Sequence, residues 1–180
     1  MRQRNIARRR TSKRRAGFTL IEVTLALIVF AMMTILFAAV FPMTVRGAQY
    51  SGNYTQAALI AQHKIDQLRS AGFRSLDQGH LSNLSVIDSP QPAGYPIVVS
   101  GGMTYSFTSA ENLVSDGVTQ GYFAPGSQGT ITVADYTALH PGSGVPAGSL
   151  ALVTVSVAWV GSATHSGSYQ TSALLANTAP

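Results

Sequence analysis

The longest hydrophobic segment of the chain covers residues 18–41, and its single charged residue is Glu22. As an α-helix, a run of this length would be about 36 Å long, which exceeds the thickness of a bilayer's hydrocarbon core, about 30 Å. The run is longer than the apolar core of an ordinary secretory signal, and no A-x-A-like cleavage site follows it. The pattern therefore predicts a membrane-spanning helix.

A second helical pattern covers about residues 54–73. Its apolar positions recur at spacings of four and three residues and so share one helix face; they are Tyr54, Ala58, Ala61, Ile65 and Leu68. Leu59 and Ile60 fall off this stripe, either as scattered surface residues or as contacts to neighbouring chains. Gly72 suits the position just after the last helical turn.

Pro42 and Gly47 lie between the two helical patterns, and Gly52 follows them. Proline removes a backbone donor and glycine weakens a helix by about 1 kcal/mol relative to alanine. We therefore expect one long helix over residues 18–71, with a soft stretch at about 42–53 where Pro42 and Gly47 confer flexibility.

The composition beyond Gly72 shifts to Gly, Ser, Thr and Pro with short β-rich runs. Alternation over 150–160 predicts the clearest strand, with a return strand at 168–175 after a turn at 161–167. A hairpin is expected from 97–100 and 103–108 with Gly101-Gly102 as its turn. Residues 129–134 form a weaker strand candidate, and 77–94 and 117–149 are expected to be long loops.

The net charge of +5 and pI of about 9.9 would favour a nucleic-acid or anionic-membrane partner if the charge were spread over the fold. Eight of the twelve basic residues instead precede Phe18, without any acid, and the chain from Phe18 onward carries a formal −3. The positive-inside rule then predicts a cytoplasmic N-terminus. Two alternatives for the basic arm fit less well. A nucleic-acid-binding arm is disfavoured because no aromatic residues are interleaved with the basic ones, and a twin-arginine export signal is disfavoured because the apolar run is too long.

The junction between the basic arm and the apolar segment reads Arg14-Arg15-Ala16-Gly17-Phe18-Thr19-Leu20-Ile21-Glu22-Val23. It resembles the processing motif of type IV prepilins and type II secretion prepseudopilins over about residues 14–41. The resemblance implies that a prepilin peptidase cuts between Gly17 and Phe18 and methylates the new Phe18 amine. More loosely, the run AxxKIDQLRSAGF resembles the end of the long helix in minor pilins and minor pseudopilins.

Residue chemistry supports this interpretation independently. Gly17 lacks a Cβ, so a protease can approach its backbone closely. An ionisable residue inside an apolar span costs about 2.5–3.5 kcal/mol near the helix centre and marks a functional position by default. As in the family, Glu22 is expected to pair with the Phe18 amine of a neighbouring subunit during assembly. The alternative is a Glu22 that reaches the headgroup region within an ordinary anchor.

We expect no catalytic site, metal site or cofactor. The chain has no cysteine, its histidines at positions 63, 80, 140 and 165 lack metal-ligand spacing, and Asp116 and Asp135 stand alone without a D-x-D run. No G-x-S-x-G or Walker A pattern occurs, and a Ser, a His and an Asp coexist in almost any chain of this length. Trp159 is expected in the core.

Together these features predict an α+β, pilin-like fold in which a long N-terminal helix packs on a C-terminal antiparallel β-sheet head. We expect a leader at 1–17 that is removed, a transmembrane and filament-core helix at 18–41, an outer helical half at 42–72 and a β-rich head at 73–180. The resemblance implies that the chain is a minor pilin or minor pseudopilin of a type IV pilus or type II secretion pseudopilus.

The resemblance also implies the partners and the location. The partners are prepilin peptidase, other pilin or pseudopilin subunits, an inner-membrane assembly platform and the lipid bilayer, with no nucleic acid for the mature head. The location is the inner membrane, with a cytoplasmic N-terminus and an external or periplasmic head, and then the filament. The alternative is a single-pass, membrane-anchored exported binding module or enzyme outside any filament.

Overall fold

The computed structural model describes residues 17–115, 120–161 and 166–177. The chain forms two compact units, Met1–Val45 and Arg46–Pro180, and helix α1 (Leu20–Ala71) contributes residues to both. The second unit contains a five-stranded antiparallel sheet. The predicted α+β fold, a long N-terminal helix with an antiparallel sheet after it, is confirmed.

Within the first unit, α1 is apolar on every side. None of its most apolar stretch is buried by the other described residues. A helix that is hydrophobic all round needs cover from lipid or from other helices. By length and composition, α1 is able to cross a membrane.

Helix α1 continues without a break through Pro42 and Gly47. Pro42 has no N–H to donate to the carbonyl four residues earlier. In the following turn, Thr44 Oγ1 donates to the carbonyls of Val40, at 3.3 Å, and Phe41, at 2.8 Å. The helix ends as predicted: Gly72 adopts a left-handed φ of 80°, and its N–H donates to the Leu68 carbonyl at 3.1 Å. The loosening predicted for 42–53 stays a prediction.

The sheet of the second unit follows chain order, so each strand is antiparallel to the one before it. Its strands are β1 (Ile97–Val99), β2 (Gly102–Ser106), β3 (Gln128–Asp135), β4 (Leu150–Trp159) and β5 (Gly167–Ala176). The strands predicted at 129–134, 150–160 and 168–175 are confirmed within one residue at each end. The turn expected at 161–167 includes residues 162–165, which lie outside the described residues.

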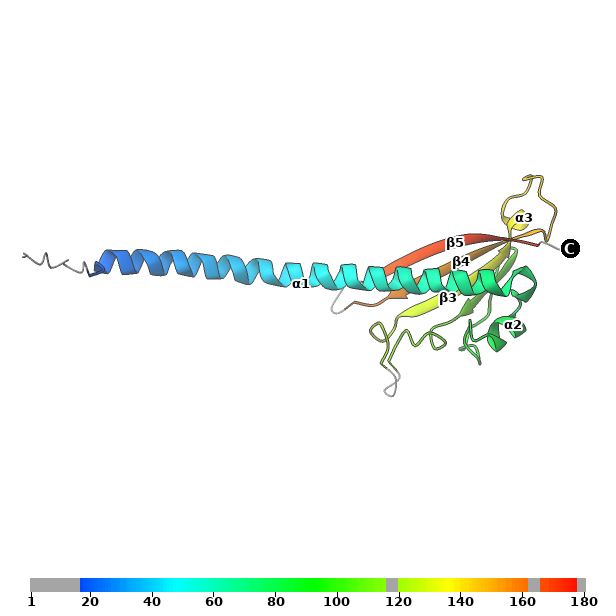
Figure 1. The fold of residues 1–180 in the computed structure, drawn as a ribbon, viewed down its shortest axis with the longest axis horizontal. Helices are drawn as coiled ribbons and strands as arrows, with labels where there is room; N and C mark the ends of the chain where they lie inside the picture. Colours follow the sequence, from blue (N-terminus) through cyan, green and yellow to red (C-terminus); the bar gives the residue numbers. More distant parts are fainter. Residues whose placement is uncertain (1–16, 116–119, 162–165, 178–180) are drawn as a thin grey trace, which may run out of the picture. The chain divides into compact units, whose positions relative to one another are not determined.

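The two faces of the sheet differ in polarity because side chains alternate along each strand. One face packs against the part of α1 from Arg46 onward (Figure 1) and supplies buried Tyr105, Ile131, Val153, Val155, Val157 and Trp159. Across the opposite face a row of hydroxyls runs through the register: Thr104 bonds Thr132 at 2.8 Å, and Thr154 bonds Ser172 at 3.0 Å. The predicted core position of Trp159 is confirmed.

The face of α1 that enters the core is wider than the predicted stripe. Ile60, expected off the stripe, is only 7% exposed, whereas Tyr54, expected on it, is 47% exposed. A helix lying on a sheet buries the paired positions i, i+3 and i+4 in successive turns, which here are Ala57, Ile60, Ala61, Lys64, Ile65 and Leu68. Leu59 is exposed, as the stripe predicts.

The first hairpin turns one residue earlier than predicted. Val99 pairs with Gly102, so the turn consists of Ser100 and Gly101, and Gly101 takes the left-handed φ of 72°. Gly102 belongs to β2, where a Cβ would lie 1.9 Å from the Val133 carbonyl oxygen of β3. The second glycine therefore serves close strand packing rather than the turn.

The two predicted long loops contain short helices that the sequence pattern did not indicate. α2 (Gln78–Asn83) lies within 77–94, and a 3₁₀ turn, η1 (Phe73–Ser75), precedes that loop. α3 (Tyr136–Leu139) directly follows β3 within 117–149. Asp77 and Asp135 cap α2 and α3 by accepting from the N–H groups of His80 and Thr137. These N-cap residues were the missed signal.

Candidate functional site

The junction predicted to be processed lies at the start of the described residues. Gly17, Phe18 and Thr19 precede the first turn of α1 and are exposed. A Cβ added to Gly17 would meet nothing within 4 Å, and Phe18 is 83% exposed. An exposed backbone outside regular secondary structure is accessible to a protease. The leader before Gly17 lies outside the described residues.

Glu22 lies in the first turn of α1, where a carboxylate interacts favourably with the N-terminal end of the helix dipole. Its N–H donates to the Thr19 carbonyl at 3.0 Å, which starts the helix. Four-residue spacing places Phe18, Glu22, Ala26 and Phe30 along one face of the helix, and these residues line a shallow groove. Among the described residues no cation lies within 4 Å of the Glu22 carboxylate.

Two of the three threonines of the apolar segment form hydrogen bonds within the helix. Thr24 Oγ1 donates to the Leu20 and Ile21 carbonyls at 3.1 and 2.9 Å, and Thr34 Oγ1 donates to the Phe30 carbonyl at 2.9 Å. Such bonds to the preceding turn remove the cost of exposing a hydroxyl to hydrocarbon. Glu22 is the one charged side chain of residues 18–41, and it has no described ion-pair partner.

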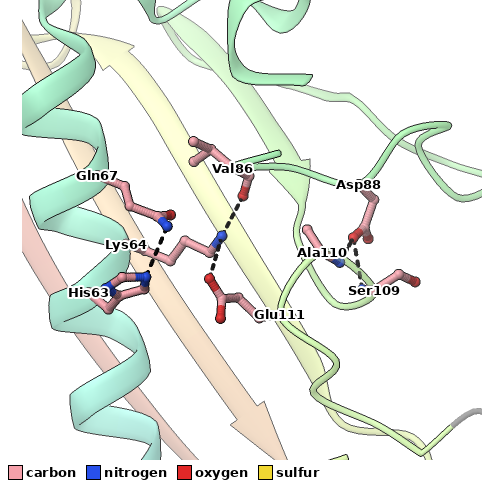
Figure 2. A network of polar contacts seen from close by, with 8 residues as sticks. All are labelled: His63, Lys64, Gln67, Val86, Asp88, Ser109, Ala110 and Glu111. Atoms are coloured by element: carbon pink, nitrogen blue, oxygen red, sulfur yellow. Dashed lines mark hydrogen bonds and ion pairs between the residues drawn. The ribbon is translucent and has the colours of Figure 1, made fainter. Parts of the chain in front are cut away.

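A second polar cluster lies inside the β-rich unit, around a lysine of α1 (Figure 2). Lys64 is 0% exposed; its Nζ donates to the Val86 carbonyl at 2.9 Å and lies 2.8 Å from Glu111 Oε1. The same nitrogen lies 5.3 Å from the centre of the Phe107 ring. Burial lowers the pKa of Lys64, against the opposing effect of the hydrogen bond to Glu111. This cluster fastens α1 to residues 86–111.

Asp88 organises the segment that carries Glu111. It is 4% exposed, and its Oδ1 accepts from the N–H groups of Ser109 and Ala110 at 2.8 and 2.7 Å. Its Oδ2 accepts from Ser106 Oγ at 2.6 Å. These bonds hold the chain after β2 in a tight bend, which aims Glu111 at Lys64 (Figure 2).

Sequence reasoning missed Lys64 and its partners. The signal was available: position 64 lies three residues after Ala61 and four before Leu68, within the stripe that faces the core. A basic residue there requires a buried acceptor. Lys64 is closed off from solvent, and the contacts of its cluster join α1 to residues 86–111.

The other candidate residues remain apart. His63 contacts Gln67, His80 contacts Asp77 and His140 stacks on Tyr136, while His165 and Asp116 lie outside the described residues. Within the described ranges, no three His, Cys, Asp or Glu side chains converge as metal ligands would. Asp135 is engaged by Thr137 and by the Gly148 N–H at 3.0 Å, and these backbone and side-chain hydrogen bonds lower its pKa.

Comparison with known families gives one match, at this junction. Residues 12–38 match the model described as the prokaryotic N-terminal methylation motif, which is the type IV prepilin-like signature. The match includes Gly17, Phe18 and Glu22 and most of the apolar segment. No curated protein and no solved structure matches the chain.

Proposed function

We propose that this chain is a structural subunit, a minor pilin or minor pseudopilin, of a type IV pilus or type II secretion pseudopilus. The methylation motif at residues 12–38 is the observation that carries the proposal. It supports prepilin-type processing, and with the apolar part of α1 it supports membrane anchoring. The finer assignment, a subunit of a filament, is our inference.

Processing starts the proposed mechanism. Prepilin peptidase cuts after Gly17, removing the leader 1–17 with its eight basic residues, and methylates the amine of Phe18. Before cleavage the leader holds the N-terminus on the cytoplasmic side. Afterwards residues 18–41 carry no cationic side chain, so the helix can leave the bilayer outward together with the external head.

Assembly would use the two charges left at the end of the helix. The Phe18 amine of one subunit pairs with Glu22 of its neighbour, while the apolar helices bundle in the filament core. A pair in this low-dielectric setting is strong, and an unpaired partner is costly. The uncovered apolar surface of α1 and the absence of a described partner for Glu22 support this role.

The partition of the chain follows from this mechanism. Residues 18–41 serve as membrane anchor and then as filament core, 42–72 as the outer half of the helix, and 73–180 as the head. Pro42 and Gly47 weaken the helix between the anchor and the head, which lets the helix adjust when a subunit enters the filament. The proposed partners are the peptidase, other subunits and an inner-membrane assembly platform.

Mass spectrometry of the protein isolated from its native membrane tests the proposal. We expect a mature N-terminus at Phe18 with one added methyl group. In a strain without the peptidase, or with Gly17→Ala, the precursor should keep its leader. If wild-type protein carries the intact leader, the chain is instead an ordinary membrane-anchored exported module, and the filament assignment is wrong.

A separate assay tests Glu22. The variant Glu22→Gln keeps the size of the side chain but loses its charge, so we expect normal cleavage with little or no incorporation into filaments. Asp66→Asn is a matched control, because Asp66 is exposed on α1 in the β-rich unit. Normal filament incorporation of Glu22→Gln would show that the carboxylate does not pair during assembly.

A further inference from the structure

A cavity of about 610 Å³ lies at the beginning of the β-rich unit. One side is formed by α1 residues at spacings of three, one and three, which share a helix face. The other side comes from residues 122–124 and 160–161. The side chains that matter for its chemistry are Arg46, Gln49, Tyr50, Asn53, Tyr122 and Phe123.

The cavity has a rigid aromatic wall. Tyr50 and Phe123 both contact the ring of Trp159, with centroid distances of 6.0 and 6.1 Å, and Trp159 itself is almost fully buried. Tyr50 and Tyr122 are also about half exposed, at 48% and 53%. Tyrosines with an apolar ring against protein and a hydroxyl near solvent are typical of membrane interfaces.

Of the described residues that line the cavity, Arg46 alone carries a charge. Among the described residues, no carboxylate lies within 4 Å of its guanidinium. From Arg46 to the C-terminus, four basic side chains oppose six acidic ones, which leaves a formal −2. The unit as a whole would be repelled by an anionic surface, whereas this cavity offers a cation without a described acidic partner, beside amide donors from Gln49 and Asn53.

Chain connectivity limits the distance between Arg46 and the apolar run. Arg46 is five residues after Phe41, the last residue of the apolar run. Five residues span at most about 18 Å even when fully extended. The polar zone of each leaflet is about 5–7 Å thick, and a long arginine side chain reaches toward it. Arg46 thus lies at most about 18 Å from the end of the apolar run, and the proposal requires an arrangement of the two units that brings its side chain to the polar zone.

We propose that this cavity docks onto the headgroups of anionic phospholipids. Arg46 binds the phosphate, Gln49 and Asn53 bind its neighbouring oxygens, and Tyr50 and Tyr122 lie at the level of the acyl esters. The inference rests on the proposed function, because it requires residues 18–41 in the bilayer with the β-rich unit outside. It identifies the surface by which a membrane-stored subunit rests on lipid before assembly.

Trp159 is the sole tryptophan of the chain and contacts two residues that line the cavity, so its fluorescence reports on docking. The processed protein is placed in nanodiscs of phosphatidylcholine alone or of an equimolar mixture with phosphatidylglycerol. Both contain the same fraction of a lipid with a spin-labelled headgroup, which quenches fluorescence at short range. We expect stronger quenching with phosphatidylglycerol, and a loss of this difference at high salt.

The variant Arg46→Gln should lower the docked fraction in phosphatidylglycerol about fivefold, the effect of one basic residue at an anionic surface. Arg74→Gln is the matched control, because Arg74 is exposed at the far end of α1 and should leave quenching unchanged. The melting curve of each variant, followed by far-ultraviolet circular dichroism, verifies that the fold is intact.

Three results would overturn the proposal. The first is equal quenching in the two lipids, and the second is unchanged quenching in Arg46→Gln. The third is full competition by millimolar inorganic phosphate at matched ionic strength, which would mean a site for free anions rather than a lipid surface. Failure of the proposed function has a different signature, since an unprocessed or unanchored chain is recognised by its N-terminal mass and by failure to enter nanodiscs.

Discussion

The buried Lys64–Glu111 pair allows a sharp test of what holds α1 against the sheet. Lys64 is 0% exposed, while the side chain of Glu111 is 19% exposed. Removing the acid by Glu111→Ala leaves a buried ammonium with only the Val86 carbonyl and the Phe107 ring as partners. Breaking a fully buried pair in this way costs about 3–5 kcal/mol. Because Glu111 is partly solvated, we expect about 2–3 kcal/mol here.

The reverse change should cost much less. Lys64→Met keeps an unbranched chain of similar length and removes the charge whose burial is unfavourable, while Glu111 can turn toward solvent. The direction of the pKa shift agrees: the pKa of Lys64 is lowered mainly by burial, so desolvation outweighs the attraction of Glu111. We expect a loss of at most about 1 kcal/mol, from the unpaired Val86 carbonyl.

The double variant Lys64→Met/Glu111→Ala separates this explanation from simple loss of contacts. Once the ammonium is gone, deleting its acid adds little, so the double variant should be more stable than Glu111→Ala alone. The assay is thermal unfolding of the full chain in detergent, followed by Trp159 fluorescence. At about 3–4 °C per kcal/mol, Glu111→Ala should lower Tm by roughly 10 °C. Additive losses, or a larger loss in Lys64→Met, would refute the reasoning.

The same pair has a pH signature. Lys64 has a lower pKa in the folded protein than the ordinary value of 10.5, so between the two values the unfolded chain binds more protons. The free energy of unfolding of the wild type, relative to Lys64→Met, should therefore rise with pH as pH approaches 10.5. A falling difference would mean that pairing with Glu111, not burial, dominates the pKa.

The remaining predictions concern three other positions. Gly129→Ala should destabilise by at least about 1–3 kcal/mol, because a Cβ there would lie 2.6 Å from a buried phenyl ring and a leucine methyl group. Gly52→Ala, a helical position with nothing within 4 Å, should instead be neutral or stabilise by up to about 1 kcal/mol in the same melts. Asp135→Ala should lower stability at neutral pH, because hydrogen bonds depress the pKa of Asp135 in the folded protein. The difference in the free energy of unfolding between wild type and variant should be complete above pH 3.8 and disappear as pH falls below that value.

The sequence predicted the helix and most strands because their signals are local. A continuous apolar run, a glycine able to adopt positive φ after the last turn, and strict alternation from Val153 to Trp159 each specify structure without distant contacts. The processing junction is equally local: Gly17, Phe18 and Glu22 lie within six residues.

The errors occurred where a distant strand or loop decides the outcome. Ser100, Gly101 and Gly102 allow two hairpin turns of equal length, and the close approach of β3 to Gly102 selects one. Likewise, whether the side chain of Ile60 is buried depends on how the helix rests on the sheet. Neither the position of β3 nor this contact angle is encoded in the neighbouring residues.

By itself, the sequence determined an apolar segment long enough for a membrane, the basic arm before it and a matched methylation motif at their junction. These follow from residue types and spacing along one chain. Only the tertiary structure decided that Lys64 is buried and that Glu111, 47 residues later, neutralises it. It also decided that Arg46 and Tyr122 line one cavity. Such partners meet only when the sheet folds onto α1, because burial and electrostatic pairing depend on distance in space rather than on separation along the chain.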